Sequence, residues 1–251
     1  MPASGLRALG IRAASFVSLI LLWQVGSHFL GPRKLPSPAT VAYVLGTAIT
    51  EGNLLFHLGV TLLRVAVSFV VAMTIGTTVG IAMGRLPRVD RFFDSWLIVL
   101  LTFPALVAAV LCYLWFGFGE VAAVAAVAIN KIPNVAVTMR EGARALNRDL
   151  LDMATAFRFS RFKTLRHIVV PALAPFFIAA ARSGLALIWK IVLVVELLGR
   201  SNGVGFQISV FFSFFDVASI IAYTIAFVVV IQVVEFGILQ PLDRHMVRWR
   251  R

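Results

Sequence analysis

Six long apolar runs, separated by short basic segments, constrain this chain more than any other feature of its sequence. An α-helix rises about 1.5 Å per residue, so a run of about 20 apolar residues crosses the hydrocarbon core of a bilayer. Of the 251 residues, 60% are hydrophobic and 14% are charged, whereas about a quarter of a soluble domain is charged. The sequence therefore predicts an all-α, polytopic membrane protein with six transmembrane helices. The predicted spans run from about Ala13 to Leu30, His57 to Gly84, Asp94 to Phe116, Glu120 to Met139, Ala172 to Leu198 and Val217 to Leu239.

The distribution of Lys and Arg predicts how these spans are oriented. Sixteen of these residues lie in alternate segments, namely residues 1–12, 85–91, 140–166 and 244–251. The segments on the other side hold only Arg33, Lys34 and Arg200. Because cytoplasmic segments carry the excess of basic residues, both termini and residues 140–166 are expected in the cytoplasm. The net charge of +12 is concentrated in these segments, which favours a lipid bilayer and argues against a nucleic-acid partner.

The residues before the second span predict two further elements. The first apolar run is interpreted as a retained helix, because it has no Ala-x-Ala cleavage pattern, with a signal peptide as the alternative. Ser37 and Pro38 are typical of a helix cap and a first helical position. An interfacial helix is therefore expected from Pro38 to about Gly52 and Asn53.

Small residues and prolines predict features within the spans. Gly76, Gly80 and Gly84 recur every four residues, which predicts a flat helix face for close helix packing. Pro104 lies near the middle of the third span, which is expected to be kinked there. The Gly-rich segment 199–205 contains no Gly-x-x-x-x-Gly-Lys-Ser/Thr motif, so it predicts a tight turn before an interfacial half-helix rather than a phosphate-binding loop.

A charged island, from Glu141 to Pro171, interrupts the apolar chain. Its apolar residues recur at helical spacing between charged ones, which predicts short amphipathic helices. Ser160 is a suitable N-cap for a second helix beginning at Arg161, and Pro171 is expected to end that helix. Two helices at an angle, forming a docking surface, are therefore predicted for residues 141–170, which are called the docking loop below.

The docking loop carries a family resemblance. Asp152-Met153-Ala154, then Arg158, then Ile168-Val169-Val170-Pro171 resembles the cytoplasmic loop of ABC-importer permeases, which reads Glu-Ala-Ala, three residues, Gly, and an apolar stretch closing in Leu-Pro. Asp152 keeps the charge of the family's glutamate but has a shorter reach. Arg158 replaces a glycine whose backbone is permissive, so the bend is expected to be built differently here. The string Leu35-Pro36-Ser37-Pro38 resembles the nitrate, sulfonate and taurine branch of the family.

The resemblance implies a partner for the docking loop. In the family this loop inserts into a groove on an ATPase subunit and transmits its closure. The coupling residues implied here are Asp152, Met153, Ala154, Phe157, Arg158, Ser160, Arg161 and Pro171. The alternative is a basic loop lying on anionic lipid.

The resemblance also implies an architecture and a function. Residues 55–251 resemble the permease domain, and residues 1–54 add a transmembrane helix and an interfacial helix. The implied assembly has two permease copies, two ATP-binding subunits and an external solute-binding protein in the inner membrane. A small, anionic, nitrate-, sulfonate- or taurine-like solute would be imported by alternating access. An importer of the same type for a neutral or aromatic solute, such as a vitamin precursor, is the alternative.

Enzymatic chemistry is not indicated by the sequence. The four histidines are scattered, and His-x-x-His and Cys-x-x-Cys motifs do not occur. Without a Walker motif the chain is not expected to hydrolyse ATP, so ATP and Mg²⁺ are expected on the partner ATPase. Catalytic residues, metal ligands and cofactors of its own are not predicted. The single cysteine, Cys112, lies in an apolar span and excludes an internal disulfide.

Ionisable residues within the spans are candidates for a substrate pathway, because burying charge in a membrane is costly. Lys131, Arg182, Lys190 and Glu196 are the candidates, with Lys131 and Lys190 first because the family branch does not usually carry them. The resemblance implies that an arginine and a glutamate at positions 182 and 196 are usual in the branch, so a structural role for these two is an equal alternative. Pairing of these lysines with Glu196, Asp216 or a neighbouring subunit's carboxylate is an equal alternative. Arg64 lies near the outer end of its span and is expected to snorkel. A self-sufficient secondary transporter or channel is the main rival function, although it would need no docking loop.

Overall fold

The computed structural model describes residues 3–239, and these residues form only helices and the turns between them. The four arginines of residues 244–251, used above to predict orientation, lie outside the described residues. The elements are α1 (Ala3–Leu30), α2 (Pro38–Thr50), α3 (Leu54–Arg85), α4 (Pro87–Thr102), α5 (Ala105–Phe116), α6 (Glu120–Arg144), α7 (Arg148–Ala156), α8 (Arg161–Thr164), the π-helix η1 (Leu165–Val169), α9 (Val170–Gly199), α10 (Val204–Ser213), α11 (Val217–Val234) and the π-helix η2 (Glu235–Leu239). The predicted all-α class is confirmed.

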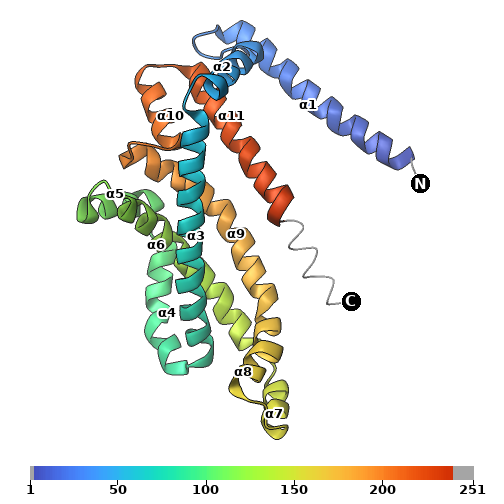
Figure 1. Ribbon diagram of the computed structural model, residues 1–251, viewed down its shortest axis with the longest axis vertical. Coiled ribbons are helices and arrows are strands. Elements are labelled where there is room, and N and C mark those ends of the chain that lie inside the picture. Colours follow the sequence, from blue (N-terminus) through green and yellow to red (C-terminus); the bar gives the residue numbers. More distant parts are fainter. Residues whose placement is uncertain (1–2, 240–251) are drawn as a thin grey trace.

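The molecule is elongated, and α3, α6 and α9 run along its long axis (Figure 1). One end carries the docking loop with α7 and α8, and the opposite end carries α2 and α10. We call the latter the distal end. Five helices within the described residues are long and apolar enough to span a membrane, and the α4–α5 pair makes a sixth if it is counted as one bent span.

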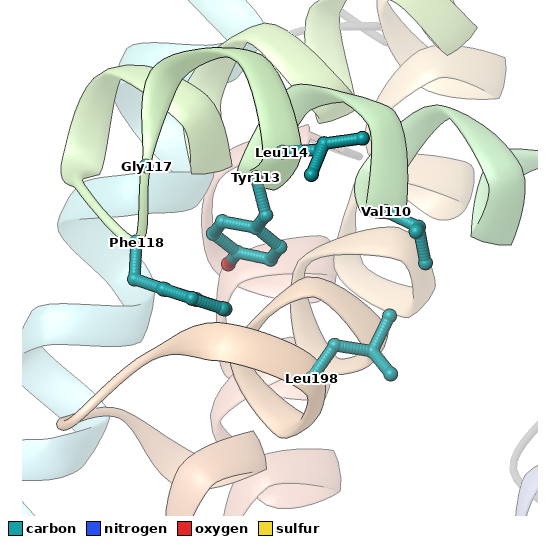
Figure 2. A pocket seen from close by; sticks show the side chains of 6 residues that line it. All are labelled: Val110, Tyr113, Leu114, Gly117, Phe118 and Leu198. Carbon is teal, nitrogen blue, oxygen red and sulfur yellow. The ribbon is translucent and has the colours of Figure 1, made fainter.

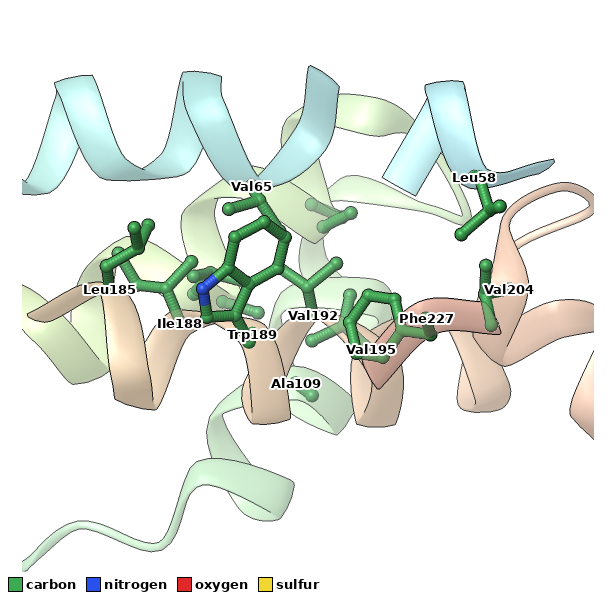
Figure 3. Packing of buried hydrophobic residues seen from close by; sticks show 14 of the residues in the cluster. Leu58, Val65, Ala109, Leu185, Ile188, Trp189, Val192, Val195, Val204 and Phe227 are labelled. Atoms are coloured by element: carbon green, nitrogen blue, oxygen red, sulfur yellow. The ribbon is translucent and has the colours of Figure 1, made fainter. Parts of the chain in front are cut away.

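The main apolar core lies between α3, α6 and α9 and extends to α5, α10 and α11. Figure 3 shows Trp189 of α9 among Val65 of α3 and neighbouring aliphatic side chains. Phe227 of α11 meets the Trp189 ring edge to face at 5.8 Å between centroids. These contacts hold the three long helices and α11 together through side-chain packing.

The N-terminal helices lie at the edge of this bundle. Ser37 accepts a hydrogen bond from the Thr40 N–H and Pro38 begins α2, as predicted. The Trp23 indole donates to the Pro36 carbonyl at 3.0 Å, which joins α1 to the connector. From Ala13 onward most α1 side chains are exposed, and Figure 1 shows α1 diverging from the bundle.

The third predicted span is broken rather than kinked. α4 and α5 are bent by 101° across a break at Phe103 and Pro104. Both residues have extended backbone, because the residue before a proline is driven out of the helical region and the proline lacks a donor. The prediction of a single helix with a kink was therefore wrong, and α5 is a separate half-helix.

Pro171 does not end a helix, contrary to the prediction. The helix that begins at Arg161 continues without a break to Gly199. Between Leu165 and Val169 it widens into a π-turn, in which the Val170 N–H donates to the Leu165 carbonyl. Pro171, which cannot donate to the helical ladder, follows this wider turn directly. The fifth span therefore begins inside the docking loop.

Candidate functional site

The docking loop presents an apolar surface beyond the end of the bundle. The Asn147 side chain caps α7 by accepting from the Asp149 N–H at 2.8 Å. Ser160 caps α8 by accepting from the Lys163 N–H at 3.3 Å, as predicted. Ala154 is buried, whereas Asp152, Met153 and Phe157 are exposed. Leu150, Phe162 and Leu165 add exposed apolar area.

Arg158 makes the bend between α7 and α8. The Phe159 N–H donates to the Ala154 carbonyl at 2.8 Å, and the Arg158 N–H donates to the Thr155 carbonyl at 3.0 Å. This pair of bonds is a Schellman motif, which requires a left-handed residue at its C′ position. Arg158 occupies that position with φ 51°. The expectation that the bend is built differently was wrong, because the arginine adopts the conformation that glycine adopts readily.

An ion cluster at the base of the docking loop was not foreseen from the sequence. Arg140 of α6 reaches Asp94 of α4 at 2.6 Å, and Arg144 reaches Asp90 at 2.5 Å. Both pairs follow helical spacing, with two acids four residues apart on α4 and two arginines four residues apart on α6. That complementary spacing is the signal that could have predicted the contact.

The three glycines of α3 face α6. A Cβ on Gly76 would lie 2.6 Å from the Val135 Cβ, and one on Gly84 would lie 2.6 Å from the Ala143 Cβ. A Cβ on Gly80 would overlap the Ala136 carbonyl oxygen. The contact residues on α6 rise in number together with the glycines on α3, so the two helices run parallel. Their backbones are in close contact at these positions.

The intramembrane basic residues lie in different environments. Lys131 is 1% exposed, and its side chain packs against Gly184 of α9. A Cβ on that glycine would lie 2.7 Å from the lysine Cε. Arg182 lies 3.8 Å from the Glu235 carboxylate. Lys190 is exposed, and among the residues that the structure describes neither lysine has a hydrogen-bond or ion-pair partner. The structure therefore does not bring the four pathway candidates together.

A polar stripe on α6 accompanies Lys131. Asn130, Asn134 and Thr138 are half-buried and four residues apart, and each side chain donates to the carbonyl four residues before it. Sequence reasoning missed these residues, although a polar group every fourth position within an apolar run was the available signal.

The distal end contains a second charged group, the distal polar cluster. Its members are His57, Thr61, Arg64, Glu120, Glu196, Arg200 and Asn202. Arg64 does not snorkel, contrary to the prediction, because it is 3% exposed and pairs with Glu196 and, at 2.7 Å, with Glu120. Glu196 is fully buried. Polar residues at positions 57, 61 and 64, one helical turn apart, were the signal that a polar partner faces α3.

An apolar hollow of about 480 Å³ lies beside this cluster, between α5 and the end of α9. Figure 2 shows Tyr113, Phe118 and Leu198 around it. The Tyr113 hydroxyl donates to the Val195 carbonyl at 2.8 Å, which ties α5 to α9. Within residues 3–239, three His, Cys, Asp or Glu side chains are nowhere close enough together to hold a metal ion.

A bundle of helices long and apolar enough to span a membrane, with an exposed loop at one end, defines a polytopic helical membrane protein. The chain belongs to the family of inner membrane components of binding-protein-dependent transport systems, whose family model matches residues 72–246. The family predicted from the docking-loop motif is therefore confirmed, and the chain is an ABC transporter permease.

Three relatives illustrate the similarity across nearly the whole chain. The putative aliphatic sulfonates transport permease protein SsuC of Bacillus subtilis (strain 168) is 29% identical over 92% of this chain and 84% of its own length. The taurine transport system permease protein TauC of Escherichia coli (strain K12) is 26% identical over 93% of this chain and 86% of its own length. The formylaminopyrimidine transport permease protein ThiX of Halalkalibacterium halodurans is 24% identical over 94% of both chains.

Proposed function

We propose that this chain is the transmembrane subunit of an ATP-driven importer for a small organic anion of the sulfonate class. Two copies would form the pathway, two ATP-binding subunits would supply ATP hydrolysis with Mg²⁺, and an external binding protein would deliver the solute. The relatives named for aliphatic sulfonates and taurine support the solute class. In this proposal the docking loop and both termini face the cytoplasm, and the distal end faces outward.

The docking loop supports the ATPase partner. Met153 and Phe157 are exposed on a loop that also carries Asp152, and Phe157 is 71% exposed. Exposed apolar groups gathered on one surface are typical of a protein–protein interface. Three basic residues are exposed as well, namely Arg158, Arg161 and Lys163. The exposed Asp152 adds an acidic group that anionic lipid would repel, so the mixed surface favours a protein partner.

Lys190 is the observation that carries the solute proposal. It is exposed on α9, nine residues from the end of the helix at Gly199, which corresponds to about 14 Å. An ammonium facing lipid at that depth is costly, so this face of α9 is inferred to line a hydrated path between two permease copies. Ser183 and Ala186 share the exposed face and leave room beside the lysine.

The other candidates take different places in this proposal. Lys131 lies inside one protomer and would meet the solute only if α6 and α9 separate, so its contribution is expected to be smaller. Arg182 is proposed to be structural because it lies beside Glu235. Glu196 is assigned a positioning role below.

Replacement of Lys190 by Met tests the solute proposal. We expect Lys190→Met to lower uptake of radiolabelled taurine or a linear alkanesulfonate at least tenfold in cells, with the chain still assembled with its ATPase. Lys190→Arg is the matched control, because it keeps the charge and should keep most of the uptake.

Three results would contradict the proposal. Wild-type uptake by the Met variant would remove Lys190 from the pathway. Loss of the assembled complex would instead indicate a structural ion pair with a second subunit, because an unpaired buried partner is strongly destabilising. Uptake of a formylaminopyrimidine, undiminished in the Met variant, would favour a neutral solute.

A further inference from the structure

The chain between α9 and α10 lies directly on a buried carboxylate. Gly203 has φ 107°, and a Cβ there would lie 2.5 Å from both Glu196 carboxylate oxygens. A Cβ on Gly205 would lie 2.7 Å from the Glu196 Cβ. Only glycine allows the backbone to approach this closely, so Gly203 brings the loop onto the carboxylate and Gly205 brings the start of α10 onto Glu196 and the Leu193 carbonyl of α9.

Three successive backbone N–H groups at the start of α10 are bound by side chains from two other helices. The Gly203 N–H donates to His57 Nδ1 at 3.0 Å, and the Val204 N–H donates to Thr61 Oγ1 at 2.9 Å. The Gly205 N–H donates to Glu196 Oε2 at 2.9 Å. The first N–H groups of a helix have no partner within it, and a carboxylate there also matches the positive end of the helix dipole.

The carboxylate is itself held in place. Thr61 Oγ1 donates to Glu196 Oε2 at 2.9 Å, and the Arg64 guanidinium pairs with Glu196 Oε1. Arg64 also binds Asn202 at 3.0 Å, within the loop before α10. Among the described residues, the charged side chains that reach the start of α10 and the loop before it are Glu196 of α9 and its counter-ion Arg64 of α3.

The cluster extends to α6 through Glu120, which binds Arg64 at 2.7 Å and Arg200 at 2.5 Å. Two arginines and two glutamates thus balance each other between α3, α6, α9 and the loop before α10. α10 is a helix of ten residues, which is too short to span a membrane.

We propose that Glu196 and Arg64 are positioning residues that clamp the N-terminal end of α10 onto α3, so that the distal ends of α3, α6, α9 and α10 move as one body during transport. Only the part of this inference that concerns movement during transport rests on the proposed function. Loss of the clamp should detach α10 while the α3–α6–α9 bundle stays closed.

Cysteine accessibility tests this clamp without any knowledge of the solute. Cys112 is buried and is the single cysteine of the sequence, so Cys112→Ser provides a background without cysteine. Val204→Cys places a probe in α10 and Val192→Cys places a matched probe in α9, because both valines are fully buried. Labelling by a fluorescent maleimide is measured in membranes that contain the full chain, with and without Glu196→Gln.

The clamp predicts that Glu196→Gln raises the labelling rate at position 204 at least tenfold and leaves position 192 unreactive. Faster labelling at both positions would show that Glu196 supports the whole bundle, and no change at position 204 would show that it does not hold α10. Either result would overturn the proposal.

A second variant guards against poor accumulation of Glu196→Gln. Thr61→Val keeps the side-chain shape but removes the hydroxyl that accepts from Val204 and donates to Glu196. It is judged by the same two probes, and failure of both variants to accumulate would also count against a clamp confined to α10. Absence of uptake in the wild type would sink the transport proposal alone, because the labelling results do not depend on it.

Discussion

At the scale of single residues, the backbone conformation of Arg158 departs from ordinary helical geometry. Arg158 is left-handed in a turn that the hydrogen bonds of a Schellman motif require. The left-handed conformation costs an L-residue with a Cβ about 1–2 kcal/mol, whereas glycine adopts it without this cost. The arginine therefore retains a local strain at the centre of the docking loop.

Substitution of Arg158 by Gly or by Val is predicted to change the stability of the docking loop in opposite directions. Arg158→Gly should stabilise the loop by about 1 kcal/mol, and Arg158→Val should destabilise it by about as much, because a β-branched residue tolerates φ > 0 poorly. The rate of chymotryptic cleavage within residues 141–170 measures this, with about fivefold changes expected in opposite directions. Equal rates for the Gly and Val variants would show that the loop tolerates any backbone at position 158.

Whole elements are held together by close backbone packing in one pair and by charge in others. α3 and α6 approach through Gly76, Gly80 and Gly84, as small residues allow in membrane helices. At the base of the docking loop, α4 joins α6 through Asp90 and Arg144. Apolar packing also holds α4, because its buried Leu97 lies against Met83 of α3 and Ala136 of α6.

Gly80→Leu is predicted to disrupt the α3–α6 pair. A Cβ at this position already overlaps the Ala136 carbonyl and lies 2.8 Å from the Met139 Cβ, so a leucine must force the helices apart. Overpacking of this kind typically costs about 1–3 kcal/mol, which should lower the thermal unfolding midpoint of the purified chain. Gly59→Leu is the matched control on the same helix, because nothing lies within 4 Å of a Cβ there. Equal midpoints for both variants would refute close packing at Gly80.

At the scale of the whole molecule, the two ends carry different helices and present different surfaces. Figure 1 shows α7 and α8 at one end and α2 and α10 at the other. The long helices α3, α6 and α9 connect these ends, and α9 is continuous with η1 and α8. In the proposed function, a displacement of the docking loop would be transmitted along α9. This continuity supports mechanical coupling between the two ends.

Asp152→Lys is predicted to detach the ATPase without unfolding the helices, because it reverses an exposed charge on the docking loop. Co-purification of the ATPase with the tagged permease should fall at least tenfold while the yield of permease is unchanged. Glu51→Lys makes the same charge reversal on an exposed residue near the distal end and should retain the ATPase. Full co-purification with the Asp152 variant would place the interface elsewhere.

Local signals in the sequence were enough to predict most of the helices and the family. Run length and composition predicted the spans, Ser37 and Pro38 predicted the start of α2, and the motif around Asp152 indicated a permease. These features depend on residues within one or two helical turns of each other, which is the range over which propensity and capping act.

Only the tertiary structure decided how the polar groups are paired and how the chain bends. Arg64 and Glu196 are separated by 132 residues, and their pairing depends on how α3 packs against α9. The 101° bend at Pro104 and the continuous helix through Pro171 show that the same residue type breaks one helix and is accommodated by another. The difference lies in whether neighbouring turns can widen and whether packing holds the segment straight, and both depend on contacts far away in the sequence.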